Sequence, residues 1–345
     1  MKKWFLHIGP NKTGSTYIQK HLLANREELL SLGLNYPSFG IGPQYGHHQL
    51  FENIKKLGQE ELDEYVDHFS GAAVNFVSSE KFSQLKPEDV AKFGKSLSKV
   101  NVQVIFFHRN YVDLLPSHWQ ERVKHKSRLS FYEFLFPHVF RPFSSSIINP
   151  DVVLDSYATA FGKDHITVID YDTALKTGDI LRPILELTGV ELSGVKNEVV
   201  NRSLTFELVE IIRALNITAE RKDELHSYDV RTIFLRKRKE RAIQGEVEAL
   251  AAVIRDHMKP LRLDRSPFVK SVNTAFIRKY GSCLFNRPLD ELPSRELLVP
   301  RDSWMLQRVA VDACERIYQY ILAGDVLDSE RRDVAEVDSV KASAS

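Results

Sequence analysis

Short apolar runs alternate with helical patterns along the first half of the chain. Four such runs cover residues 4–9, 74–79, 102–107 and 166–171. Apolar residues at helical spacing follow over 17–32, from about 88, over 112–126 and over 180–187, and Gly33 is placed to end the first helix. Continuously apolar strands that alternate with helices are typical of a parallel sheet covered on both faces. The pattern therefore predicts an α/β fold in which helices flank a parallel sheet.

The second half of the chain has a different pattern. Beyond about residue 197 the strand signals fade, and helical segments remain near 204–215, 233–258 and 304–322. Neither an internal repeat nor a Gly/Ser/Pro-rich linker interrupts the sequence. We therefore predict a single domain over 1–330, with an α/β core (1–195) and a mostly helical C-terminal part (196–330). Residues 331–345 lack aromatics and periodicity, which predicts a disordered tail. We expect a long loop and a short helix over 37–64.

Composition narrows the classes of partner and compartment. The chain has 345 residues, of which 43% are hydrophobic, so it can bury a large core. Its 47 Lys and Arg balance 46 Asp and Glu, which argues against bulk affinity for nucleic acid or an anionic membrane. No apolar segment is long enough for a signal peptide or a spanning helix. With only two cysteines, Cys283 and Cys314, which we expect in the core, the sequence predicts a cytoplasmic protein without integral membrane association.

The segment HIGPNKTGSTY lies between the first predicted strand and the first predicted helix. There, backbone N–H groups and the helix dipole favour a bound phosphate. Gly9 and Gly14 are separated by four residues, as in a P-loop, and Thr16 adds a hydroxyl. Ser15, however, occupies the place of the P-loop lysine, and Lys12 supplies the positive charge instead. We therefore predict a P-loop-like phosphate site that departs from that of nucleoside triphosphatases.

A second candidate anion site follows the strand at 102–107. Arg109 stands at the predicted strand end, and Ser117 follows eight residues later on the next helix. Glu80 stands at the end of the strand at 74–79. In open α/β sheets ligands bind at the carboxyl ends of the strands, so Arg109, Glu80 and Lys12 are expected at one crevice. Two separated anion sites predict a ligand with two anionic groups; the alternative is that Arg109 forms a structural ion pair, for example with Asp113.

At these residues the sequence resembles the sulfotransferase superfamily, which uses 3′-phosphoadenosine-5′-phosphosulfate (PAPS) as donor. The resemblance spans about residues 4–125 and rests on Lys12-Thr13-Gly14-Ser15-Thr16, which resembles the 5′-phosphosulfate loop, and on Arg109 with Ser117, which resembles the 3′-phosphate motif. Glu80-Lys81 resembles the Glu-Lys stretch of glycan sulfotransferases, including heparan-type enzymes. The resemblance implies sulfuryl transfer to a hydroxyl or amine acceptor, with a carbohydrate favoured, and 3′-phosphoadenosine-5′-phosphate (PAP) as product.

The resemblance also assigns roles to residues. It implies that Lys12 neutralises the bridging oxygen and that Glu80 is the general base. Tyr17 falls where cytosolic members of the superfamily carry an adenine-stacking tryptophan. We predict no metal, because no cluster has ligand spacing. Other residues receive secondary roles. His47, His48 and His108 are reserve bases, and Asp170 and Asp172 are structural caps. Trp119 and Tyr157 are expected in the core, and the charged run at 236–241 is expected to be solvated.

Two other classes remain open. A P-loop kinase or nucleoside triphosphatase would need a lysine after the second glycine and a carboxylate that helps to hold magnesium. The sequence shows Ser15 at the first position and no clear candidate for the second. A non-catalytic nucleotide-binding protein would keep the pocket and lack transfer activity, and the presence of Lys12 and Glu80 argues against it.

Overall fold

The protein is described from a computed structural model, which covers residues 2–42, 44–69, 71–192, 204–222, 227–286 and 296–323. The chain divides into two compact units. The first comprises Met1–Leu114, His138–Arg202 and Asp264–Ser294, and the second comprises Leu115–Pro137, Ser203–Leu263 and Arg295–Ser345. The units therefore interleave along the sequence. The single domain over 1–330 stays a prediction, and the tail at 331–345 lies outside the described residues.

The first unit contains a five-stranded sheet in the order β2-β3-β1-β4-β5. Every neighbouring pair runs parallel, and Phe5 of the central strand lies opposite Phe76 on one side and Gln103 on the other. This confirms the predicted α/β fold with a parallel sheet flanked by helices. The strands are β1 (Lys3–His7), β2 (Leu34–Asn35), β3 (Val74–Ser78), β4 (Asn101–His108) and β5 (Ile166–Asp170).

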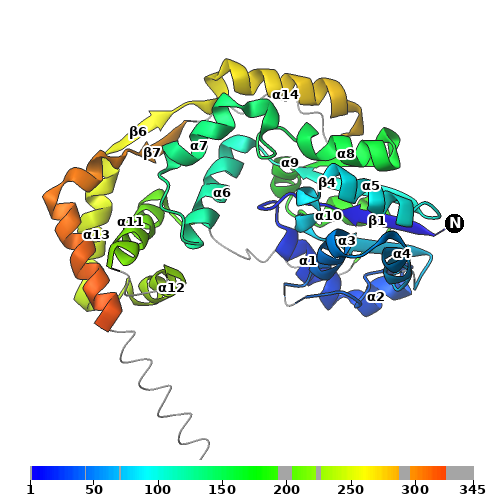
Figure 1. The fold of residues 1–345 in the computed structure, drawn as a ribbon, viewed down its shortest axis with the longest axis horizontal. Helices are drawn as coiled ribbons and strands as arrows, with labels where there is room; N and C mark the ends of the chain where they lie inside the picture. Colours follow the sequence, from blue (N-terminus) through cyan, green and yellow to red (C-terminus); the bar gives the residue numbers. More distant parts are fainter. Residues whose placement is uncertain are drawn as a thin grey trace, which may run out of the picture. The chain divides into compact units, whose positions relative to one another are not determined.

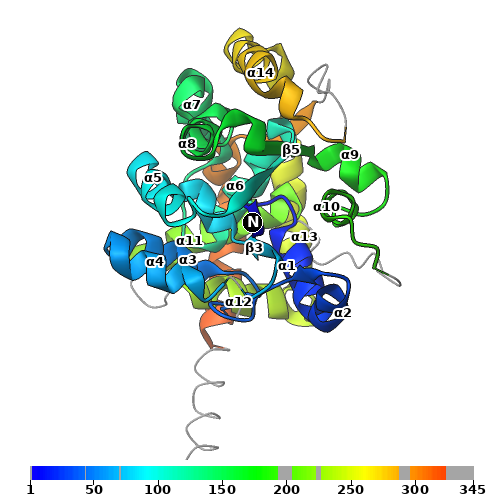
Figure 2. The ribbon, with the colours of Figure 1, turned by 90° about the vertical axis from the view of Figure 1, so that its right-hand side faces the viewer.

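Both faces of this sheet are covered because successive side chains of β1 point to opposite sides. Trp4 and Leu6 belong to the core on one face, and Phe5 belongs to the core on the other. The first face packs against α3 (His48–Lys56), α4 (Gln59–Asp67), α5 (Pro87–Ser96), α8 (Asp151–Phe161) and α14 (Pro267–Tyr280). The second packs against α1 (Ser15–Ala24), α2 (Arg26–Ser31), α9 (Tyr171–Lys176) and α10 (Arg182–Thr188). Figure 1 labels these helices, and Figure 2 shows α3, α4 and α5 on one side of the strands and α1, α2, α9 and α10 on the other.

Several helices differ from the predicted ones. The helix expected over 17–32 is split at Asn25, whose amide Nδ2 donates to the carbonyl of His21 at 2.8 Å and so competes with the helical pattern. Helix α9 begins directly after β5, because the Asp170 carboxylate accepts the backbone N–H of Thr173 at 2.6 Å. The capping role predicted for Asp170 is thereby confirmed. Residues 37–64 contain helix α3 and most of α4, so the expected long loop is shorter.

The second unit is mostly helical, as predicted for the C-terminal part. Trp119 is fully buried there, as is Tyr157 in the first unit, so both are core residues. A short antiparallel pair, β6 with β7, was not predicted in this part of the chain. The helix expected over 233–258 is interrupted within 236–241, a run whose residues are largely exposed. The elements are α6 (Tyr111–Lys124, which begins in the first unit), α7 (Phe131–Phe140, which ends in it), α11 (Phe206–Lys222), α12 (Ser227–Lys237), α13 (Arg241–Asp256), β6 (Met258–Leu261), β7 (Leu297–Pro300) and a helix at 308–323.

A buried ion pair organises the second unit. Arg213 donates to both carboxylate oxygens of Glu210 and to Asp302, and the indole of Trp304 donates to Glu210 at 3.0 Å. Glu210 and Arg213 are 1% and 3% exposed, so each charge depends on these partners for solvation.

The two cysteines and the membrane expectation complete the description. Cys314 is buried, as predicted, whereas Cys283 is only half-buried at the edge of the first unit's core. Within the described ranges, no helix combines the length and the apolar character that crossing a membrane requires.

Candidate functional site

The loop between β1 and α1 is held in a fixed conformation. Gly9, Lys12 and Gly14 have φ angles of 91°, 69° and 78°, a region that favours glycine. A Cβ on Gly9 would lie 2.9 Å from the Cα of Glu80, so the loop passes directly against the start of the segment after β3. The carbonyl of Gly9 accepts the N–H of Phe107 at 2.9 Å, which ties the loop to β4 as well. The predicted phosphate loop therefore lies at the carboxyl ends of β1, β3 and β4.

The amino end of α1 has the properties of an anion site. No side chain in the described part of the protein caps this ten-residue helix, and the N–H groups of its first turn have no partner within the helix itself. The hydroxyl of Ser15 is buried and has no hydrogen-bond partner among the described residues. The hydroxyl of Thr13 instead donates to the carbonyl of Pro10 at 2.6 Å, so it stabilises the loop. Thr16 is exposed at the same helix end. An uncapped helix end with a buried hydroxyl is the kind of place where anions bind in proteins, and a phosphate here stays a prediction.

Arg109 follows β4 and reaches the loop. Its Nη1 donates to the carbonyl of Lys12 at 2.6 Å, and its guanidinium lies 5.1 Å from the centre of the Tyr171 ring. Its Nε is buried without a partner in the part of the chain that the structure describes. Burial raises the pKa of the nearby Asp172, while the bond from the N–H of Asn110 and the charge of Arg109 lower it. The structure thus brings Arg109 to the phosphate loop and leaves one donor uncommitted.

Ser117 and Tyr17 are the two remaining residues predicted to bind the nucleotide. Ser117 lies on α6 but belongs to the second unit, which begins at Leu115. Its joint role with Arg109 therefore stays a prediction. Tyr17 is 8% exposed and belongs to the core on the second face of the sheet, with its ring centre 4.3 Å from that of His21. Adenine stacking requires an accessible ring face, so this burial weighs against the stacking role.

Glu80 begins the short 3-10 turn Glu80–Gln84 directly after β3. Its Oε2 accepts a hydrogen bond from Nε2 of Gln19 at 3.0 Å, and its Oε1 lies 3.8 Å from Nε2 of His48. The Glu80 side chain is 17% exposed, so it retains access to solvent. The sequence prediction placed Glu80 correctly at the strand end but missed Gln19. The available signal was a glutamine between Ile18 and Leu22, on the buried side of α1.

The three reserve bases have different surroundings. His47 is fully buried, with Nδ1 accepting the N–H of Ser78 at 3.1 Å and Nε2 donating to the carbonyl of Pro37 at 2.9 Å. Burial lowers the pKa of His47 to about 4, and it does the same for His108, which stacks on a phenylalanine ring. Because both nitrogens of His47 are occupied, it is a poor proton acceptor. Among these three histidines, His48 is the one beside Glu80.

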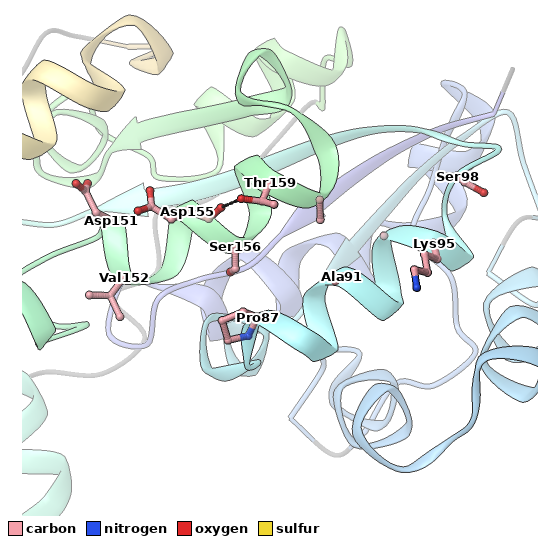
Figure 3. A pocket seen from close by; sticks show the side chains of 11 residues that line it. Pro87, Ala91, Lys95, Ser98, Asp151, Val152, Asp155, Ser156 and Thr159 are labelled. Atoms are coloured by element: carbon pink, nitrogen blue, oxygen red, sulfur yellow. Dashed lines mark hydrogen bonds between the residues drawn. The ribbon is translucent and has the colours of Figure 1, made fainter.

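A cavity of about 580 Å³ lies elsewhere in the first unit, between α5 and α8 (Figure 3). Small residues are among those that line it, and a Cβ on Gly94 would lie 3.1 Å from the Ala160 Cβ. Lys95, Asp151 and Asp155 line it as well. None of the predicted site residues lines this groove. The candidate site therefore rests on the loop and its neighbours and not on this cavity.

Comparisons with known proteins add little. No protein-family model matches the chain, and no curated protein matches it. Among solved structures, the chain is similar to a sulfotransferase from Alicyclobacillus acidocaldarius, with 15% identity and a TM-score of 0.38, over 67% of this chain and 95% of that one. A TM-score of this size carries no argument about function. Among the described residues, no group of three or more His, Cys, Asp or Glu could hold a metal ion; that no metal is used stays a prediction.

Proposed function

We propose that this protein is a sulfotransferase that moves a sulfuryl group from PAPS to a hydroxyl or amine acceptor. One observation carries the proposal. The two predicted anion-binding elements are joined by the bond from Arg109 to the carbonyl of Lys12 at 2.6 Å, and each holds a buried polar atom without a partner among the described residues, Ser15 Oγ and Arg109 Nε. Buried polar groups are normally satisfied, so such atoms are candidates for ligand contacts.

Each candidate residue would have a separate role in sulfuryl transfer. PAPS supplies an activated sulfuryl group when bound. The backbone N–H groups of Thr13 to Thr16 would hold its 5′-phosphate. Arg109, together with Ser117, would hold its 3′-phosphate. Glu80 would accept the proton of the acceptor as the new bond to sulfur forms, an S–O bond for a hydroxyl or an S–N bond for an amine. Lys12 would neutralise the charge left on the bridging oxygen as the old S–O bond breaks and PAP departs.

Nucleotide preference tests this proposal against the kinase alternative. PAP should bind the purified protein without magnesium and much more tightly than ATP, because ATP lacks the 3′-phosphate that Arg109 would contact. Isothermal titration calorimetry with both nucleotides, each with and without magnesium, measures this preference. Equal affinities, or ATP binding that depends on magnesium, would favour a P-loop kinase or nucleoside triphosphatase.

The class of acceptor requires a separate assay. The similarity of Glu80-Lys81 to glycan sulfotransferases favours a carbohydrate, and we expect a cytoplasmic enzyme that acts without a metal or a nucleic-acid partner. Transfer from radiolabelled PAPS to a panel of glycans, lipids and phenols identifies the acceptor class. Tight PAP binding without transfer to any member of the panel would favour a non-catalytic nucleotide-binding protein.

A further inference from the structure

Gln19 lies in an unusual position for a polar side chain. It is 1% exposed, and its Nε2 donates to two oxygens, Glu80 Oε2 at 3.0 Å and Ser78 Oγ at 3.1 Å. Ser78 is also bonded to His7 through its hydroxyl at 2.8 Å, so it does not depend on Gln19. Among the described residues, Gln19 is the one whose side chain donates a hydrogen bond to the Glu80 carboxylate. The buried amide is therefore directed at one carboxylate.

The surroundings hold this amide in place. A Cβ on Gly46 would lie 2.7 Å from Gln19 Nε2 and 2.9 Å from its Oε1, so the loop before α3 closes directly over the amide. Gly46 has no positive φ, so its backbone conformation would accept a larger residue. The obstacle to a larger residue is the contact with the Gln19 amide. The glutamine is thus confined between this loop and the end of β3, and its rotamer is fixed by packing.

The other neighbours of Glu80 are charged or titratable but lie farther away. His48 faces the opposite carboxylate oxygen at 3.8 Å, beyond hydrogen-bond distance, while its Nδ1 is bonded to the hydroxyl of Ser79 at 2.8 Å. Lys81 is paired with Glu52 at 3.4 Å. The pKa of the buried Tyr36 is raised by burial and then by the charge of Glu80. Among the described groups around Glu80, only Gln19 is hydrogen-bonded to its carboxylate.

We propose that Gln19 is a positioning residue for the general base: its amide orients the Glu80 carboxylate beside the predicted phosphate loop. Gln19 lies about one helical turn beyond Ser15, so one rigid element, α1, carries both the candidate phosphate site and the donor that orients the base. This inference rests on the proposed function for its catalytic consequence, whereas the effect on Glu80 itself can be measured in the absence of any substrate.

The direct test follows the Glu80 carboxyl carbon by NMR in ¹³C-glutamate-labelled protein, with the signal assigned by its loss in Glu80→Gln. Gln19→Met keeps the size of the side chain and removes the N–H donor. Because a hydrogen bond to the carboxylate favours the charged form, its removal should raise the pKa of Glu80 by about one unit. The acid limb of kcat/KM should move to higher pH by the same amount, while PAP affinity stays within about twofold, since Gln19 is not assigned to the nucleotide.

A second variant keeps the test valid if Gln19→Met does not fold. Gly46→Ala displaces the Gln19 amide without removing it and should shift the pKa of Glu80 in the same direction by a smaller amount. Gly42→Ala is its matched control, because a Cβ there meets nothing within 4 Å and Gly42 has no positive φ. Gln103→Leu, which removes an amide bonded to Thr167 at 2.7 Å, controls for loss of a partly buried glutamine. Neither control should change the pKa.

The outcomes separate the two proposals. An unchanged pKa of Glu80 in both Gln19→Met and Gly46→Ala would overturn the positioning role, even if the enzyme transfers sulfuryl groups. A raised pKa in a protein that transfers nothing would sustain the contact between Gln19 and Glu80 and reject the proposed function instead.

Discussion

Replacement of Arg109 by alanine tests the proposed second anion site most directly, because two separable tasks are proposed for this side chain. Its Nη1 bond to the carbonyl of Lys12 at 2.6 Å would stabilise the phosphate loop for any nucleotide. Its Nε, which is buried without a partner among the described residues, would be available to the 3′-phosphate, a group that PAP carries and AMP lacks. The loop contribution should therefore affect PAP and AMP equally, and the phosphate contribution should affect PAP alone.

The magnitude follows from the kind of contact. A hydrogen bond to a charged group contributes about 1.5–3 kcal/mol. Arg109→Ala should therefore lower the affinity for PAP by about tenfold to a hundredfold more than it lowers the affinity for AMP. Arg109→Lys keeps the charge without the planar guanidinium, so its PAP affinity should lie between those of the unaltered protein and Arg109→Ala. Arg182→Ala, at an exposed ion pair with Glu186 on α10, is the matched control and should change neither affinity. Calorimetry with both nucleotides measures the difference. Equal losses for PAP and AMP would show that Arg109 acts only on the loop.

Three further predictions concern the loop, the base and the buried histidines. Lys12→Ala should lower kcat more than it weakens donor binding, because its charge is most useful when the bridging oxygen becomes negative; steady-state kinetics that show a change in KM alone would contradict this role. Glu80→Gln should lower turnover by about a hundredfold to ten-thousandfold with little change in PAP affinity or Tm, since the new amide oxygen can still accept from Gln19; near-normal turnover would move the search for the base to His48. Burial lowers the pKa of His7 to about 3 and of His47 to about 4, so below pH 6.5 the unfolded chain binds protons that the folded chain does not. Each of these two histidines should therefore cost about 2 kcal/mol of stability between pH 7 and pH 5, a loss that levels off near the folded pKa values. Urea unfolding across this range measures the slope, and a flat profile would show that these histidines are not buried in neutral form.

Much of the first unit could be predicted from local pattern alone. The strand predictions at 4–9, 74–79, 102–107 and 166–171 agree with β1, β3, β4 and β5 to within a residue or two. These strands are covered on both faces, so their sequences are continuously apolar, and that signal requires no knowledge of the rest of the chain. Gly9 and Gly14 were likewise readable, because a strand-to-helix turn with left-handed backbone needs glycine at fixed positions.

Other elements left no such signal. The ribbon of β6 and β7 is too short and too mixed in polarity to show an alternation, and the break between α12 and α13 falls in a charged run without glycine or proline. Helix α14 was not predicted, and its sequence does not show that it belongs with the sheet. Its assignment to the first unit is set by contacts such as the stacking of His108 on Phe276, whose ring centres are 4.9 Å apart.

The candidate site shows the same division. The sequence alone placed Lys12, Glu80 and Arg109 at strand ends, which is enough to expect them at one edge of a parallel sheet. Which atoms meet depends on the folded chain: the bond from Arg109 to the Lys12 carbonyl joins residues 97 apart, and the bond from Gln19 to Glu80 joins residues 61 apart. Hydrogen bonds of this kind depend on side-chain direction and on distances to within a few tenths of an ångström. Local periodicity fixes the type of an element but not those distances, which arise only when the strand order brings β3, β1 and β4 side by side.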